Sequence, residues 1–297
     1  MNILAIGDTA DNIFTLKKFL KKSKIHLITF PRKGDALLTN SEEVEFFDSL
    51  LISKQVKKIK SIKNNFDICL AMSWSGARVA YLAGLNYIMY FVGNDITTPP
   101  FLSKGKISHL KNPTHKKNFF ERKFYKKIFS KAIFCITTSK EYHDHLKKYR
   151  KDGIRIDRVI VDNILFNENI KSIKRDKNKF TFLSPQRIGI EKGHDIIWKA
   201  LPLCKSDFEI LQMEWYIQNN EEEIKINKKL IEEKPSQIKL IPLVKRKELG
   251  SYITFADAIL GQLKSGIQGS IERDSAYCKK PVICYTNLKN TNIIDDK

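Results

Sequence analysis

Residues 265–283 read SGIQGSIERDSAYCKKPVI. Gly266 and Gly269 stand before three charged residues at 272–274, and a short apolar run follows at 281–283. This order predicts a glycine-containing loop, then a helix, then a strand. Two interpretations are open: an ordinary connection within an α/β sheet, or a loop whose backbone must approach a ligand closely, with an acid beside it.

Outward from this stretch, short apolar runs alternate with longer amphipathic segments along the whole chain. We expect strands at residues 1–6, 25–30, 66–71, 87–92, 132–138, 158–161, 180–185, 208–214, 238–243, 258–262 and 281–285. We expect helices at residues 11–22, 77–82, 140–149, 193–204, 221–232 and 245–256, and a further helix after residue 269. Strands separated by helices in this rhythm are typical of a parallel, doubly wound α/β sheet.

A polar stretch at residues 167–179, NENIKSIKRDKNK, interrupts the alternation and has no apolar period. Such a segment is typical of an interdomain linker, so we expect one α/β domain at residues 1–166 and a second at residues 180–297. The two halves show the same alternation of strands and helices, although their sequences do not repeat. The predicted fold is therefore a pair of Rossmann-like domains facing across a cleft.

The composition limits the class of protein. Of the 297 residues 42% are hydrophobic and 29% charged, which is typical of a soluble globular protein. No apolar run reaches the roughly 18 residues of a membrane span, and the first residues, MNILAIGDTADN, do not resemble a signal peptide. The five cysteines are scattered without metal-ligand spacing. We therefore expect free thiols in a reducing compartment, and a cytoplasmic protein.

The formal net charge of +20 makes this a basic protein, with 53 Lys and Arg residues of which ten are arginine. A lysine-biased genome explains such a composition without any function. Alternatively, the positive surface attracts polyanions or anionic lipid headgroups. No nucleic-acid-binding motif accompanies the charge, so we do not expect a nucleic-acid partner.

A second informative stretch, SPQRIGIEKGHDII, covers residues 184–197. Arg187 and Lys192 lie in a loop between the end of a predicted strand and the start of a helix, and Gly193 stands at the helix entry. The helix dipole, free backbone N–H groups and fixed cations all favour a phosphate group at such a place. A basic surface loop without a ligand is the alternative.

Residues 180–285 resemble the donor domain of GT-B glycosyltransferases, specifically the large retaining family 4. The resemblance rests on an ordered series of motifs: the loop with Arg187 and Lys192-Gly193, then Ala256-Asp257 at the end of a helix, then the loop, acid-led helix and Pro-Val-Ile strand of the opening stretch. The family continues with further strand–helix units, whereas this chain ends at Lys297. The resemblance thus implies a second domain that is incomplete at its C-terminus, with an exposed sheet edge.

The first half is similar to the family's acceptor domain. The similarity lies in the loop at residues 7–12, with Gly7 and Asn12 on the acceptor side, and in YFVGNDI at residues 90–96. The family has a histidine that contacts the donor sugar where this chain has Val92. By resemblance Asp95 would take part in catalysis from the acceptor side, and a turn cap is the alternative.

The resemblance implies that the chain moves a sugar from a nucleotide-sugar to a glycan or lipid-linked acceptor with retention. Arg187 and Lys192 would hold the donor diphosphate and stabilise the negative charge that develops on the departing nucleotide. We expect no metal, because two cations take that role and the chain has no Asp-x-Asp cluster, and no cofactor beyond the donor substrate. A non-catalytic protein that binds a nucleotide or a glycan is the alternative.

The opening stretch departs from the family pattern, which has two glutamates eight positions apart. Counting back from the proline places Asp274 at the second position and Gly266 at the first. Asp274 would contact the donor ribose, and Glu272 would serve only if the loop were rewired. The loop from Gly266 to Gly269 would bring backbone N–H groups to the phosphates, and Ser270 would also belong to the donor site. Because Gly266 lacks a carboxylate, we expect slow transfer, and we expect Gly266→Glu to raise turnover.

One basic stretch, HKKNFFERKFYKKIFSK at residues 115–131, is predicted to be a helix. Phe120, Phe124 and Ile128 recur every four residues, while lysines and an arginine fill the other face. It is either a helix that covers a sheet or an interfacial helix in peripheral contact with the anionic inner face of a membrane.

Overall fold

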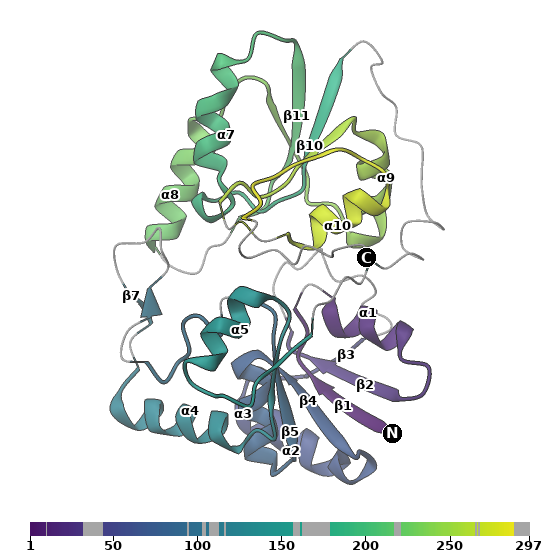
Figure 1. Cartoon of the computed structure of the whole chain (residues 1–297), viewed down its shortest axis with the longest axis vertical. Helices are drawn as coiled ribbons and strands as arrows, with labels where there is room; N and C mark the ends of the chain where they lie inside the picture. The colour runs from purple at the N-terminus through teal and green to yellow at the C-terminus, as the bar shows by residue number, and fades with distance from the viewer. Residues whose placement is uncertain are drawn as a thin grey trace. The chain divides into compact units, whose positions relative to one another are not determined.

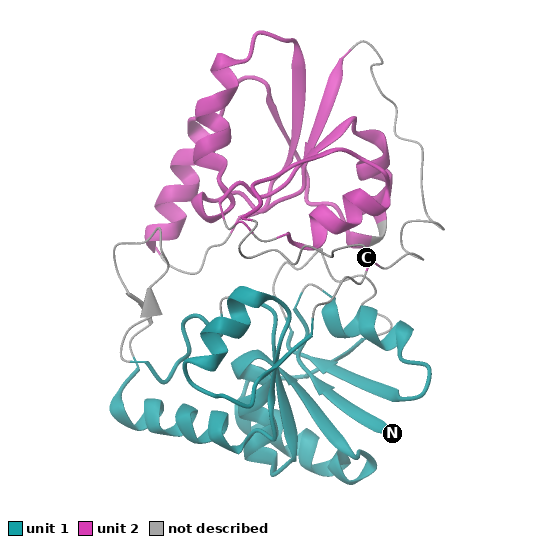
Figure 2. Cartoon of the chain, in the orientation of Figure 1, with its two compact units in different colours: residues 1–107, 112–160 teal, residues 108–111, 161–297 magenta. Residues whose placement is uncertain are grey.

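The computed structural model describes residues 1–9, 11–31, 44–93, 95–102, 105–106, 113–115, 117–156, 161, 179–216, 221–264, 266 and 268–287. The chain divides into two compact units, residues 1–107 with 112–160 and residues 108–111 with 161–297 (Figure 2). The predicted linker at 167–179 lies outside the described residues except for Lys179. The predicted strand at 158–161 also lies outside them, except for Val161.

Unit 1 is built on a parallel sheet whose first strand lies in the middle (Figure 1). The strands are β1 (Asn2–Ile6), β2 (Lys24–Thr29), β3 (Glu45–Phe46), β4 (Ile68–Met72), β5 (Tyr87–Phe91), β8 (Cys135–Thr137) and β9 (Ile154–Arg155). Their order is β3-β2-β1-β4-β5-β8-β9, and the neighbouring pairs are parallel. The chain reverses direction across the sheet between β1 and β4. Open α/β sheets bind ligands at such a switch point, at the carboxyl ends of the strands.

Helices cover both faces of this sheet. They are α1 (Asn12–Phe19), α2 (Ile52–Ile62), which continues into the short 3₁₀ helix η1 (Lys63–Asn65), α3 (Ser73–Ala83), α4 (Phe119–Lys131) and α5 (Lys140–Lys147). A small antiparallel pair, β6 (Gly105–Lys106) and β7 (Pro113–His115), precedes α4.

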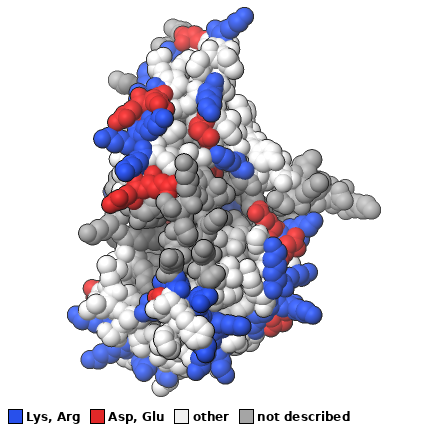
Figure 3. All heavy atoms as spheres, turned by 90° about the vertical axis from the view of Figure 1, so that its left-hand side faces the viewer, with Lys and Arg blue, Asp and Glu red and all other residues white. Residues whose placement is uncertain are grey.

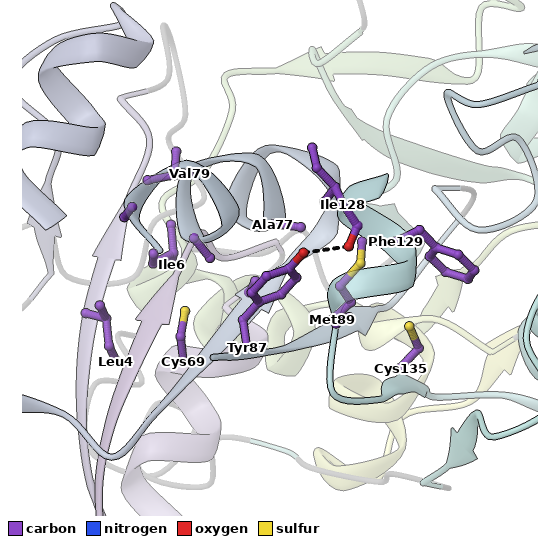
Figure 4. Packing of buried hydrophobic residues seen from close by; sticks show 14 of the residues in the cluster. Leu4, Ile6, Cys69, Ala77, Val79, Tyr87, Met89, Ile128, Phe129 and Cys135 are labelled. Carbon is purple, nitrogen blue, oxygen red and sulfur yellow. Dashed lines mark hydrogen bonds between the residues drawn. The ribbon is translucent and has the colours of Figure 1, made fainter. Parts of the chain in front are cut away.

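Successive side chains of β1 point to opposite faces of the sheet, and both faces are apolar. Leu4 and Ile6 belong to the cluster that α3 and α4 cover, while Ile3 belongs to the cluster that α1 covers. Figure 4 shows the first cluster, in which the Tyr87 hydroxyl donates a hydrogen bond to the backbone carbonyl of Ile128 on α4. The apolar inner face of α4 is thereby fixed against the sheet.

Unit 2 repeats the plan with a five-stranded parallel sheet, in the order β12-β11-β10-β13-β14. Its strands are β10 (Phe180–Ser184), β11 (Phe208–Met213), β12 (Ile238–Ile241), β13 (Ala258–Leu260) and β14 (Val282–Ile283). Its helices are η2 (Ile190–Lys192), α7 (His194–Ala200), η3 (Leu201–Leu203), α8 (Glu221–Glu232), α9 (Arg246–Phe255) and α10 (Ser270–Tyr277). The switch point of this sheet lies between β10 and β13.

The two parallel sheets with helices on their faces confirm the predicted α/β class, although several boundaries differ. The helix expected at 77–82 begins at Ser73, directly after β4. Helix α2 has no counterpart among the predicted helices, because its four lysines equal in number the four apolar residues that pack inward and obscure their period. The helix predicted over 115–131 begins at Phe119, where Asn118 and Glu121 form a capping box. None of the described helices is both long and apolar enough to cross a membrane.

Candidate functional site

The switch point of unit 2 gathers polar side chains from two segments that follow its central strands. The segment after β10 supplies Gln186, Arg187 and Lys192, and the segment after β13 supplies Gln262. Parallel strands end at the same edge of a sheet, so these residues meet although the sequence separates them widely.

Lys192 is partly buried at this edge. Its Nζ donates a hydrogen bond to Oε1 of Gln262 at 3.0 Å, and its backbone carbonyl accepts one from the N–H of Leu263 at 2.9 Å. Burial and the neighbouring positive charge of Arg187 lower the pKa of Lys192. An anion bound here would counter both effects, which makes the ammonium group a natural partner for a negatively charged ligand.

Arg187 lies beside it with a carboxylate partner of its own. Its Nε and Nη2 donate to Oε1 of Glu191 at 2.9 and 2.7 Å. Glu191 stands on η2, directly before Lys192. The structure therefore brings the two predicted cations together and fixes the guanidinium with a third, acidic residue that sequence reasoning missed.

Glu272 joins the loops of this site. Its Oε1 accepts from the N–H of Gln262 at 2.9 Å and from Nε2 of Gln186 at 3.1 Å, and its Oε2 accepts from the N–H of Gly269 at 2.8 Å. A Cβ on Gly261 or Gly269 would come within 2.5 or 2.9 Å of the Glu272 carboxylate oxygens. Gly269 is thus required in the opening stretch because the chain's own acid approaches there.

The rest of the helix start has other tasks. Ser270 is the first residue of α10 and is half-buried. Asp274 is 1% exposed, and its carboxylate pairs with Nη2 of Arg246 on α9 at 2.9 Å. The expected ribose contact of Asp274 stays a prediction, and its carboxylate takes part in this buried ion pair.

Gly266 is buried in a backbone conformation with φ +67°. A Cβ there would lie 2.7 Å from the Cβ of Asn287, whose N–H donates to the Gly266 carbonyl at 3.0 Å. A side chain is disfavoured at this position by the positive φ and also by the lack of space. The expectation that Gly266→Glu raises turnover stays a prediction, and the substitution would strain the loop itself.

A buried polar network holds the loop that carries Arg187 and Lys192. The Nε2 of His194 lies 3.0 Å from Oε1 of Gln212, and its Nδ1 lies 3.2 Å from the carbonyl of Gly189. Gln212 in turn donates to the carbonyl of Gln186 at 2.9 Å. Burial lowers the pKa of His194. The only sequence signal for this network is the occurrence of polar residues at the ends of apolar strands.

The switch point of unit 1 has a different character. Gly7 directly follows β1 with φ +84°, and the side-chain amide of Asn12 donates to the carbonyl of Thr9. Asp8 is 5% exposed, and its two carboxylate oxygens accept from the N–H groups of Ile13 and Phe14 at 3.0 and 2.8 Å. The first turn of α1 is therefore capped by the chain's own anion.

Asp95 follows β5 at the carboxyl edge of the same sheet. Burial raises its pKa to about 7, although backbone N–H groups of the turn favour the charged form, and its Oδ1 is shielded from solvent without a hydrogen-bond partner. The indole N–H of Trp74 holds this turn by donating to the Asp95 carbonyl at 2.7 Å. The turn-cap interpretation has this geometric support, and the catalytic role stays a prediction.

Groups of three or more His, Cys, Asp or Glu residues that could hold a metal ion do not occur within the described part of the chain. The five cysteines carry free thiols, of which Cys69 and Cys135 are buried.

Comparison with known proteins supports the architecture. No family model matches the chain, and no curated protein matches it. HepE of Anabaena, solved with UDP and glucose, is similar with a TM-score of 0.66 at 14% identity, over 96% of this chain and 80% of that one. Sucrose-phosphate synthase of Thermosynechococcus elongatus is similar with a TM-score of 0.64 at 13% identity, over 96% and 81% of the two chains.

A glycosyltransferase of Rickettsia africae is also similar, with a TM-score of 0.60 at 17% identity, over 95% of this chain and 78% of that one. At these identities the likeness shows the fold alone. That fold is the predicted pair of Rossmann-like units of the GT-B type.

Proposed function

We propose that this protein transfers a sugar from a nucleotide-sugar donor to an acceptor, and that unit 2 binds the donor diphosphate. The observation that carries this proposal is the pair Arg187 and Lys192 at the switch point of the second sheet, with Lys192 held by Gln262. Two fixed cations at a switch point favour a diphosphate. The solved structures of similar fold include HepE with UDP and with UDP-glucose, which makes UDP the first nucleotide to test.

The two cations would act on the leaving group. Breaking the bond between sugar and phosphate leaves a developing negative charge on the nucleotide, and positive groups already in place stabilise that charge without reorganisation. We propose that Lys192 contributes most, because its ammonium is partly buried and held by a neutral amide. Arg187 would contribute less while Glu191 shares its guanidinium. With these cations in place we propose metal-independent transfer with retention.

Glu272, Gln186 and Gln262 would position the site without reacting. The Glu272 carboxylate already accepts from both glutamines and from the loop before α10. It therefore sets the distance between the segment after β10, which carries both cations, and the segment after β13, which carries Gln262. The acceptor would be bound by unit 1, where the resemblance places Gly7, Asn12 and Asp95.

A second candidate is a protein that binds a nucleotide or glycan without turnover. The feature in its favour is Gly266, because the family that residues 180–285 resemble has a glutamate at this place. The space for a side chain at Gly266 is filled by Asn287. In this candidate the cation pair would still bind a nucleoside diphosphate.

The deciding experiment has two parts. First, calorimetry with UDP, GDP and ADP is expected to find one nucleotide that binds and whose binding Lys192→Ala weakens; no binding by any of the three overturns both candidates. Second, the corresponding nucleotide-sugars are incubated with glycan and lipid-linked acceptors. Release of nucleoside diphosphate, unchanged by a chelator, and a product with the donor's anomeric configuration support the transferase. Binding without release supports the second candidate.

A further inference from the structure

The positive charge is distributed unevenly along the chain. Residues 1–160 hold 30 Lys and Arg against 14 Asp and Glu, whereas residues 161–297 hold 23 against 19. A compositional bias of the genome acts on both halves of one chain alike. It therefore does not explain why four-fifths of the excess, +16 of +20, lies in the first half. Figure 3 shows Lys and Arg predominating in the lower part of the view, which Figures 1 and 2 assign to unit 1.

Within unit 1 the excess concentrates on one layer of helices. Helices α2, α3 and α4 pack side by side, with α3 in the middle. Their sequences, with η1 and the two residues before α4, carry one acid, Glu121, and the following cations: Lys54, Lys57, Lys58, Lys60, Lys63, Arg78, Lys117, Arg122, Lys123, Lys126, Lys127 and Lys131. We name this set the basic helical layer. Lys58 pairs with Glu45 at 2.8 Å, and Lys117 pairs with Glu121 at 3.2 Å.

Two aromatic side chains stand out from this layer. Phe119 is 54% exposed and Phe120 is 80% exposed, whereas Ile128 and Phe129 on the same helix are buried in the core. The rings of Phe119 and Phe120 lie edge to face, 5.8 Å apart. Exposed aromatic residues that adjoin each other within a field of cations are the pattern of an interfacial helix.

Two arginines belong to the same layer. The Tyr81 and Phe124 rings meet at the seam of α3 and α4, 5.9 Å apart. Arg78 stands one turn before Tyr81, and its positive charge acts on Glu121 in the first turn of α4. Arg122 follows in that turn, and the Nε atoms of both arginines are buried without a hydrogen-bond partner. Guanidinium groups beside an apolar anchor suit a phosphate headgroup.

We propose that the basic helical layer docks unit 1 on a bilayer surface with anionic headgroups, and that Phe119 and Phe120 enter the headgroup boundary as apolar anchors. The cations of the layer complement an anionic surface, and the two exposed phenylalanine rings favour a lipid surface over a purely polar one. A nucleic acid fits less well, because Lys123 stands 4.5 Å above the Phe119 ring and occupies one of the two faces on which a base could stack. The proposal is independent of the donor site in unit 2.

The charge requirement is tested by co-sedimentation of the full chain with vesicles of phosphatidylcholine alone or with roughly a third phosphatidylglycerol. Wild-type protein is expected to pellet with the anionic vesicles, and less as salt rises and screening shortens to about 8 Å and below. The variant Lys123→Gln/Lys126→Gln/Lys127→Gln is expected to lose affinity on the order of a hundredfold. Its matched control, Lys225→Gln/Lys228→Gln/Lys229→Gln on α8, removes the same charge from exposed positions of unit 2 and is expected to bind like wild type.

The anchors are tested with Phe119→Ser/Phe120→Ser, against Leu203→Ser as a control at a site that is 81% exposed in unit 2. Circular dichroism verifies that each variant is folded. The double variant is expected to lose at least about tenfold in affinity for anionic vesicles, since two buried aromatic groups are removed from the boundary. Equal binding to both vesicle types, equal loss in the two lysine variants, or unchanged binding of the phenylalanine variant overturns the proposal. So does binding to a single-stranded RNA that competes fully with vesicles and is insensitive to the phenylalanine change.

Discussion

The two sheets of this protein have the same strand order around their switch points, yet the residues at those points carry opposite charge. After β1, Asp8 places a buried carboxylate on the N–H groups of Ile13 and Phe14, and Asp95 follows at the end of β5. After β10, Arg187 and Lys192 place two cations at the corresponding edge of the second sheet.

The difference decides which sheet can receive a phosphate. A helix N-terminus attracts an anion through its dipole and its unpaired N–H groups. In unit 1 the chain fills that position on α1 with its own Asp8, which would also repel a second anion. In unit 2 the chain brings cations to the edge and ties Glu272 to backbone N–H groups and an amide. Topology thus provides equivalent places, and side chains determine the charge of the ligand.

The largest expected effect tests whether Asp274 belongs to the fold of unit 2 or to its ligand. Asp274→Ala removes one partner of the buried ion pair with Arg246 and is expected to cost unit 2 about 3–5 kcal/mol in free energy of unfolding. Asp207→Ala breaks an exposed pair with Lys179 and is expected to cost at most about 1 kcal/mol. Urea titration measures both. Weaker UDP binding with unchanged stability would instead assign Asp274 to the donor ribose.

The second effect tests the comparison itself. Lys192→Ala removes a charge-assisted hydrogen bond of about 1.5–3 kcal/mol, so UDP affinity is expected to fall roughly ten- to a hundredfold. Lys199→Ala, an exposed lysine on α7, and Asp8→Asn in unit 1 are expected to leave UDP affinity unchanged. Calorimetry checks all three. If Asp8→Asn changed UDP affinity as much as Lys192→Ala, the assignment of phosphate binding to the second sheet alone would be wrong.

The third effect concerns pH. The pKa of Asp95 is raised to about 7 from an ordinary value of 3.8, so its contribution to stability is fully present below that ordinary value and is lost as pH rises through about 7. Between about pH 5 and pH 8 this loss is on the order of 2 kcal/mol, and Asp95→Asn is expected to abolish it. Urea titrations at both pH values measure the difference. If the variant showed the same pH dependence of stability, the titrating group would be another residue. If the pH dependence disappeared, Asp95 would be charged only above about neutral pH, and it would add to the difference in charge between the two edges only there.

The sequence predicts much of the fold because apolar runs and amphipathic segments alternate with a regular period. The same pattern places Arg187 and Lys192 in a loop between strand and helix, where a cation pair favours an anion. It predicts α2 poorly, since five cations between residues 52 and 65 obscure the period of the inward residues Ile52, Val56, Ile59 and Ile62.

The contacts within the site cannot be predicted from local sequence patterns. Gln186 and Glu272 are bonded although 86 residues separate them, and only the pairing of β10 with β13 brings them together. Counting back from Pro281 selects Asp274, but α10 begins at Ser270, which puts Glu272 at the third helical position, where its carboxylate reaches Gly269. Helix length, which the sequence specifies only loosely, decides which acid faces the loops.

The smallest expected effect concerns the Asp8 carboxylate, which caps α1 in unit 1. Asp8→Ala leaves the N–H groups of Ile13 and Phe14 without their acceptor and is expected to cost about 1 kcal/mol, as for the loss of a helix cap. The net cost is modest because burial raises the pKa of Asp8, which offsets part of what the backbone N–H groups contribute. Sulfate should then recover part of the loss in the variant and stabilise wild type less, since the vacated helix start attracts an anion. Thermal unfolding with and without sulfate measures this, with Asp144→Ala on α5 as the exposed control. Equal stabilisation of wild type and variant by sulfate would mean that Asp8 does not keep anions from the first sheet, and that the two switch points differ less than their charges indicate.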